Sequence, residues 1–146
     1  MKKYEFTGET KQVELWNRTA MLHRIRATVE FGFVKVGELG GWIEKEENLS
    51  HEGKAWVWGN AEVCGDAEVF LASHVLVMGP VGSRNDFTTF FRDKDNEITV
   101  KCGCFLGKID KFLEKVTQTH GNNKYALVYR AAVEVAKLQI ELTERK

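Results

Sequence analysis

The chain has 146 residues, 43% of them hydrophobic and 29% charged, and its basic and acidic side chains balance to a formal net charge of zero. This length suits one domain or two small ones, and the zero net charge argues against a DNA- or RNA-binding surface. No apolar run is long enough for a bilayer span or a signal peptide. Three cysteines without a disulfide-like spacing predict reduced thiols and a cytoplasmic location. Together with the lack of a long apolar run, this predicts no membrane partner.

Residues 1–36 are expected to form a short β-hairpin or meander. Their apolar residues alternate in places, which predicts strands, with a turn near Thr7–Thr10. Because the open end of a β-coil stack exposes unpaired backbone groups, this segment is interpreted as an N-terminal β cap. His23, which lies beside two arginines, belongs either to a binding site or to the solvated face of a strand.

A period of six dominates residues 37–81. Valine recurs every six residues, at Val57, Val63, Val69, Val75 and Val81. Small residues keep a second phase of the same period, which Ile43, Leu49 and Ala55 extend toward the N-terminus. Hexapeptide periods are typical of parallel β-helices, in which each short strand turns one apolar side chain inward. The sequence therefore predicts a mainly β fold built on such coils.

The segment GELGGWIEKEENLSHEGKAWVWGNAEVCGDAEV, residues 37–69, resembles a recurring phage and prophage protein family. That family is built on a left-handed hexapeptide β-helix, and the resemblance extends over about residues 20–80. It implies a short left-handed parallel β-helix over residues 37–81. Members are often described as transferase-like because acyltransferases share the coil, although a fold does not by itself define a function.

Such a short coil buries little surface alone, and left-handed hexapeptide helices usually assemble as trimers. We therefore expect a homotrimer or a higher homo-oligomer. Trp56 and Trp58 flank Val57, so both indoles should point outward if Val57 points inward. They are interpreted as an oligomer interface or as a surface that stacks on a ligand, and ligands often bind between subunits.

His74 lies where the repeat becomes irregular. Hexapeptide acyltransferases use a coil histidine as a general base beside an acyl-CoA cleft, so His74 is the one candidate for that chemistry. Its partner is not visible in the sequence, and the long coil stack of those enzymes is missing. Pro80, the sole proline, marks the boundary to a different structure.

Residues 79–91, GPVGSRNDFTTFF, predict an anion-binding turn. Glycines allow a tight turn whose backbone N–H groups point outward, and an arginine binds phosphate through paired charge-assisted hydrogen bonds. The candidate ligand-binding residues here are Ser83, Arg84, Asn85, Thr88 and Thr89. The plain alternative is a turn in which Arg84 pairs with Asp86. The lysine and spacing of a Walker loop are absent.

Residues 82–146 are expected to form a small α+β module. Two antiparallel strands are predicted at Phe87–Arg92 and Glu97–Cys102, joined by the polar turn Asp93–Asn96. Apolar residues at helical spacing predict a helix from Ile109 to His120 and a second from about Asn123 to Thr143. The phrases KCGCF and THGNNKYA also resemble a C-terminal module of the phage-type proteins.

Cys102, Cys104 and His120 raise the question of a metal or a nucleophile. Structural zinc takes four ligands and catalytic zinc takes three plus water, so these residues form at most a minimal set. A cysteine nucleophile would need His120 beside it and a third, orienting group. The thiols could equally be buried, and His120 with Lys124 could hold a phosphate. We expect no metal and no cofactor.

Three function classes compete. We favour a non-enzymatic, phage-encoded oligomer that sequesters a small anionic, nucleotide-type ligand of host immune signalling. Trp56 and Trp58 would stack on its base, while Arg84 would hold its phosphate. The alternatives are an acyl- or nucleotidyl-transferase of the hexapeptide type, which requires His74, and a structural assembly module.

Overall fold

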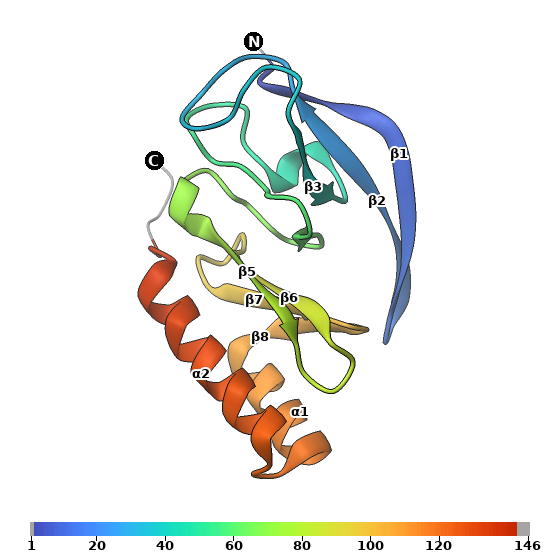
Figure 1. Ribbon diagram of the computed structural model, residues 1–146, viewed down its shortest axis with the longest axis vertical. Coiled ribbons are helices and arrows are strands. Elements are labelled where there is room, and N and C mark those ends of the chain that lie inside the picture. Colours follow the sequence, from blue (N-terminus) through green and yellow to red (C-terminus); the bar gives the residue numbers. More distant parts are fainter. Residues whose placement is uncertain (1, 143–146) are drawn as a thin grey trace.

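A computed structural model describes residues 2–142 of the chain (Figure 1). These residues form two four-stranded sheets, in the orders β1-β2-β3-β4 and β5-β6-β7-β8, and two α-helices. The first sheet contains β1 (Tyr4–Leu15), β2 (Arg18–Ala27), β3 (Leu39–Ile43) and β4 (Glu62–Val63). The second contains β5 (Val75–Val81), β6 (Asp86–Arg92), β7 (Ile98–Cys102) and β8 (Phe105–Lys108). α1 (Ile109–His120) and α2 (Lys124–Gln139) follow.

The predicted left-handed β-helix is wrong. Pairing is antiparallel throughout the second sheet and between β1, β2 and β3, and parallel strand pairing is restricted to β3 with β4. One further parallel bridge joins Leu49 to Val69. In a solenoid each coil stacks on the next. Here β5 begins at Val75 and pairs antiparallel with β6, with Val75 opposite Phe91, so the chain does not add a further coil.

The period of six nevertheless marks buried positions in the first unit. Eight residues in its two phases are at most 1% exposed: Ile43, Leu49, Ala55, Val57, Ala61, Val63, Ala67 and Val69. The β1–β2 hairpin packs over them, and the side chain of Ile25 joins the same core. Burial of these side chains removes apolar surface from water and supplies most of the stability of this unit.

The hairpin itself differs from the expectation in one respect. β1 runs on through Thr7–Thr10, where the pairing register merely shifts between Phe6 and Thr10. The chain reverses instead after Leu15, which pairs with Arg18. Trp16 therefore lies at the tip of a long hairpin that extends toward the second sheet (Figure 1).

The second unit is a meander covered by two helices. α1 packs on β7 and β8, and α2 packs on β5 and on α1 (Figure 1). The strands and the first helix expected between residues 87 and 120 are present, whereas α2 ends at Gln139. Thr143, the expected end of that helix, lies outside the described residues. The expected domain boundary after residue 81 falls in the β5–β6 turn, and the one after residue 36 falls between β2 and β3.

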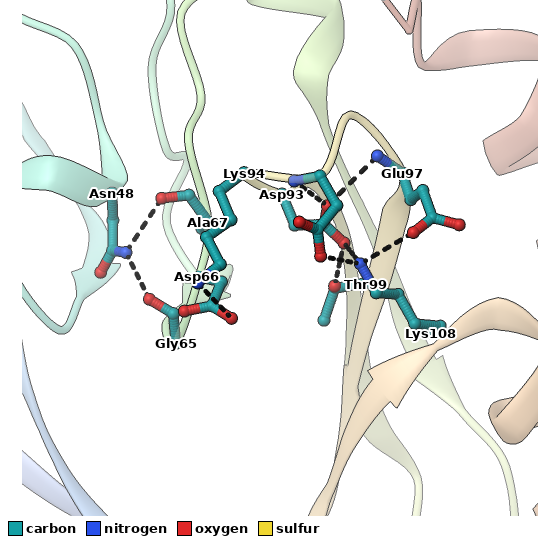
Figure 2. Close-up of polar contacts among 10 residues, drawn as sticks. Asn48, Gly65, Asp66, Ala67, Asp93, Lys94, Glu97, Thr99 and Lys108 are labelled. Atoms are coloured by element: carbon teal, nitrogen blue, oxygen red, sulfur yellow. Dashed lines mark hydrogen bonds and ion pairs between the residues drawn. The ribbon is translucent and has the colours of Figure 1, made fainter.

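A buried carboxylate organises the junction of the two units (Figure 2). Asp93 is 1% exposed, and its Oδ2 accepts hydrogen bonds from Thr99 Oγ1 and Lys108 Nζ, both at 2.7 Å. Its Oδ1 accepts from the backbone N–H groups of Asp95 and Glu97. Although burial alone would raise the pKa of Asp93, these hydrogen bonds, that from Lys108 first, hold it below its usual value.

The β6–β7 loop, which contains Asp93, also contacts residues 66–67 of the first unit through its backbone. Ala67 forms an antiparallel bridge with Asp93, and the N–H of Lys94 donates to the carbonyl of Asp66 at 2.8 Å. On the other side of residues 65–67, the side-chain amide of Asn48 donates to the carbonyls of Gly65 and Ala67, as Figure 2 shows. The two units are therefore held together by buried, directional bonds as well as by apolar contact. Among residues 2–142, no helix is both long and apolar enough to cross a bilayer.

Candidate functional site

A cavity of about 230 Å³ opens in the second unit, where four elements meet. Its walls are the β5–β6 turn, the β7–β8 turn, the second half of α1 and Tyr129 of α2. Because both turns are held by a packed scaffold and α1 is a regular helix, their side chains can face solvent while their positions stay fixed.

Basic and hydroxyl side chains surround the mouth of this cavity. Ser83 and Arg84 come from the β5–β6 turn, and Lys115, Thr119 and His120 come from α1. The first four are exposed and His120 is half-buried, so all five are accessible to a ligand. Asp86 contributes the one carboxylate among the lining residues. The balance of charge therefore favours an anion.

Aromatic rings form the floor. Phe112 lies edge-on to Tyr129 with ring centroids 5.6 Å apart, and Phe105 lies 5.5 Å from Phe112. The His120 imidazole lies nearly parallel to the Tyr129 ring, at 6.0 Å and 26°. A site with aromatic rings beside cationic side chains suits a ligand that carries both a ring and a negative charge.

Gly82 is the residue that lets Tyr129 reach the cavity. Its φ is +81°, and a Cβ at this position would lie 1.9 Å from Tyr129 Oη. The Cys102 thiol donates weakly to that hydroxyl at 3.9 Å and accepts from Thr88 Oγ1 at 3.3 Å. Burial, reinforced by Cys102, raises the pKa of Tyr129, so its hydroxyl stays protonated near neutral pH.

The structure brings three of the predicted ligand-binding residues together: Ser83, Arg84 and His120. Asn85 belongs to the same turn, with a positive φ of 55°, but does not line the cavity. Thr88 and Thr89 are each 1% exposed. Thr89 Oγ1 accepts a hydrogen bond from the backbone of Glu62, so both threonines act inside the protein rather than at its surface.

The tryptophans do not line this cavity. They line a separate cavity of about 300 Å³ with Phe33 and Lys54. Trp58 is 47% exposed, but Trp56 is 2% exposed, so the expectation that both point outward is wrong for Trp56. Trp56 packs edge-on against Phe31 and so belongs to the core of the first unit.

Lys124 also lies outside the lining of the cavity. It is the first residue of α2, and its ammonium lies 5.6 Å from the centre of the Tyr125 ring. Asn123 caps this helix by accepting a hydrogen bond from the N–H of Ala126. Lys124 is therefore an exposed residue at the start of α2, after the turn that follows His120.

His74 is placed as a structural residue. It is fully buried in a short 3₁₀ turn, Ala72–His74, and its Nδ1 accepts hydrogen bonds from the N–H groups of Phe70 and Leu71. Burial first, and the nearby charge of Arg92 second, lower the pKa of His74 to about 4. It faces no cavity among those described above, so a general base beside an acyl-CoA cleft is not formed there.

Cys102, Cys104 and His120 line the same cavity. Cys104 is exposed and Cys102 half-buried, whereas Cys64 lies in the core, where burial raises its thiol pKa to about 12. Among residues 2–142, no three His, Cys, Asp or Glu side chains are arranged to hold a metal ion. Cys102 and Cys104 therefore add polarisable sulfur atoms to the wall of this cavity and do not form a set of metal ligands.

Sequence reasoning missed Lys115, Thr119 and Tyr129. A weak signal for Thr119 exists, because Phe112, Val116 and Thr119 follow one helical face on which the first two are apolar. Tyr129 was not among the residues singled out in the second helix. Its approach to Gly82 depends on how α2 crosses the sheet, which residue spacing does not encode.

Comparison with known proteins identifies no family for this chain. Neither the comparison with protein-family models nor that with curated proteins found a match. The resemblance to a phage protein family therefore stays a prediction. The function proposed for the chain rests on the cavity between the β5–β6 turn, α1 and Tyr129, called here the anion pocket.

Proposed function

We propose that the protein is a non-enzymatic binding protein that captures a small anionic ligand of the nucleotide type in the anion pocket. The observation that carries this proposal is the convergence of Arg84, Lys115 and His120 on one cavity with an aromatic floor. The sequence resemblance adds two further parts to the proposal. The protein would be phage-encoded, and it would sequester a nucleotide of host immune signalling.

Arg84 and Lys115 supply complementary charge. A guanidinium donates paired hydrogen bonds to two phosphate oxygens, while an ammonium acts as a point charge that tolerates several ligand positions. Neither side chain has an ion pair of 4.0 Å or less with a described carboxylate. Ser83 and Thr119 add hydroxyl donors beside these charges.

The aromatic floor replaces the tryptophans as the expected partner of a ring. Phe105, Phe112 and Tyr129 line the pocket that also contains the charged groups, whereas Trp56 and Trp58 line another cavity. Buried aromatic rings hold a flat ligand by dispersion and by stacking. A ligand with one anionic group and one ring would use both parts of this site.

Self-assembly into a homotrimer or higher oligomer remains part of the proposal. It is supported by large apolar side chains that stay exposed in the single chain, among them Phe33 at 94% and Leu138 at 88%. Exposed apolar side chains of this size commonly mark contact surfaces between proteins. The transferase alternative loses its support, since its one candidate base, His74, is buried.

Native mass spectrometry tests ligand binding and oligomeric state together. The protein is measured as purified and after incubation with a panel of cyclic and ADP-ribose-derived nucleotides. We expect a nucleotide mass on the parent and about tenfold or more weaker binding by Arg84→Ala, since charge-assisted hydrogen bonds are lost. Arg26→Ala is the matched control because Arg26 pairs with Glu5 on the first sheet. A parent that binds no member of the panel, or an Arg84→Ala variant that binds as the parent does, contradicts the proposal.

A further inference from the structure

A second, larger cavity adjoins the anion pocket along α1. Its volume is about 630 Å³, and it shares Cys104, Phe105 and Lys115 with the anion pocket. Phe105 therefore lies at the boundary between the two cavities. Pockets for drug-sized ligands have volumes of roughly 300–1,000 Å³, a range that the second cavity reaches and the first does not.

Trp16 forms one wall of this second cavity. Its side chain is 70% exposed, although a large apolar ring gains by burial. Its backbone N–H donates to the carbonyl of Cys104 at 3.0 Å, which fixes the tip of the β1–β2 hairpin against the β7–β8 turn. In Figure 1 the hairpin can be followed to this end of the second sheet. The indole is thus anchored by its backbone while its face stays available.

Another part of the lining is apolar. It consists of Phe105, Leu106 and Gly107 on β8, an edge strand. A Cβ on Gly107 would lie 3.0 Å from the Phe105 ring, so the absence of a side chain there lets that ring lie over the strand. A slot between an indole and such a strand accommodates a planar ring and excludes bulky branched groups.

The charges around the slot are basic on balance. Lys111 and Lys115 line it, together with Glu114 and Lys108. Lys108 is engaged by Asp93, Asp95 and Glu97, and Lys111 forms only an exposed pair with Glu114 at 3.5 Å. Lys115 lines both cavities, so one ligand anion near Lys115 can be reached from either side of Phe105.

We infer that the cavity under Trp16 is the ring subsite of the ligand whose anionic group binds at Arg84. The occupant is a purine-sized aromatic ring that stacks on the Trp16 indole, with its phosphate beside Lys115 in the anion pocket. The inference rests on the proposed function and revises one part of it, because it places the base of the nucleotide on Trp16 of the first unit rather than on Phe112 and Tyr129. Stacking of a base on an aromatic side chain is tolerant of base identity.

Three probes separate the ring from the anion: adenosine 5′-monophosphate, ribose 5-phosphate without the ring, and adenosine without the anion. Isothermal titration calorimetry measures each with the parent and with Arg84→Ala, Trp16→Ala, Trp16→Phe and Trp58→Ala. We expect Trp16→Ala to weaken adenosine 5′-monophosphate about tenfold or more, the change that corresponds to the stacking of one base. Ribose 5-phosphate should be unaffected, Trp16→Phe should restore most of the affinity, and Trp58→Ala should behave as the parent.

The outcomes separate the inference from the function on which it rests. If no ring-bearing probe loses affinity in Trp16→Ala, or none binds the parent, the inference is overturned. Ribose 5-phosphate binding that depends on Arg84 would then leave the proposed function standing. If adenosine binds through Trp16 while ribose 5-phosphate does not bind and Arg84→Ala has no effect, the cavity under Trp16 binds a ring, but the anion pocket is overturned and the inference that rests on it falls as well.

Discussion

The two units of the molecule use their apolar residues in different ways. The first unit buries small aliphatic side chains in a regular rhythm, for example Ile43, Val57 and Val63, all 0% exposed. The second packs larger rings such as Phe90, Phe112 and Tyr129 at varied angles. Both units contain a cavity, but only the one in the second unit combines aromatic rings with several basic side chains. The proposed site therefore lies in the less regular unit, with one wall of its ring subsite contributed by the other.

The largest effect is expected at the junction of the units. Asp93→Ala removes four acceptor contacts and leaves Lys108 without its closest buried partner. Breaking a buried, hydrogen-bonded ion pair costs about 3–5 kcal/mol in the free energy of unfolding. Urea unfolding measures it.

The matched control is Asp66→Ala, because Asp66 pairs with Lys94 at 3.7 Å and its side chain is 60% exposed. An exposed pair of this kind contributes about 1 kcal/mol or less. If Asp93→Ala destabilises the protein no more than Asp66→Ala does, the junction is held by apolar contact alone and the importance given to Asp93 is wrong.

A pH effect is expected from His74, which lies just before β5, where the chain passes from one unit to the other. The folded-state pKa of His74 is lowered from 6.5 to about 4, so between these values the unfolded chain binds a proton that the folded protein does not. Stability should therefore fall as the pH is lowered through this window, by up to about 3 kcal/mol in total. Urea unfolding at several pH values measures the slope.

His74→Asn keeps a side-chain acceptor and removes the titration, so its stability should change little between pH 6.5 and pH 4.5. His23→Gln is the control, because His23 stacks on the partly exposed Phe6 at the surface. A parent whose stability is constant across the window would contradict the burial of a neutral imidazole. As the pH falls below the ordinary pKa values, 4.5 for Glu and 3.8 for Asp, the carboxylates with lowered pKa values, Glu44, Glu46, Glu62 and Asp93, add their own acid destabilisation.

A smaller effect distinguishes the pocket from ordinary turns. Gly82→Ala and Gly8→Ala both place a side chain at positive φ, +81° and +95°, which costs about 1–2 kcal/mol. A Cβ at Gly8 meets nothing within 4 Å, whereas one at Gly82 collides with Tyr129. Gly82→Ala should therefore lose more stability than Gly8→Ala, and it alone should weaken ligand binding. Equal losses in unfolding and unchanged binding in both would contradict the role of Gly82.

The sequence predicted local structure better than arrangement. The period of six identified buried residues such as Leu49 and Val69, since inward spacing is a local property of the chain. It did not determine how many coils would stack. After His74 the chain forms β5, which pairs antiparallel with β6 instead of adding a coil. Handedness and coil number depend on long-range pairing, which the spacing of valines does not record.

The site was predicted in part for the same reason. Ser83 and Arg84 follow from glycine and charge within a few residues, and His120 from a helix end. Trp16 could not be assigned, because its role depends on a hairpin tip reaching Cys104, 88 positions later in the chain. Trp56 was misplaced because alternation predicts an outward side chain next to the inward Val57, whereas Trp56 packs against Phe31 and is buried as well.

The central claim is that an anionic, ring-bearing ligand binds to the second unit at the anion pocket. The most direct test is a titration of ¹⁵N-labelled protein with adenosine 5′-monophosphate, followed by NMR. The account predicts that amide signals of residues 82–85, 102–105 and 115–120 shift together, with those of residues 54–58 unchanged. Shifts confined to residues 54–58, or no shifts at all, would contradict it.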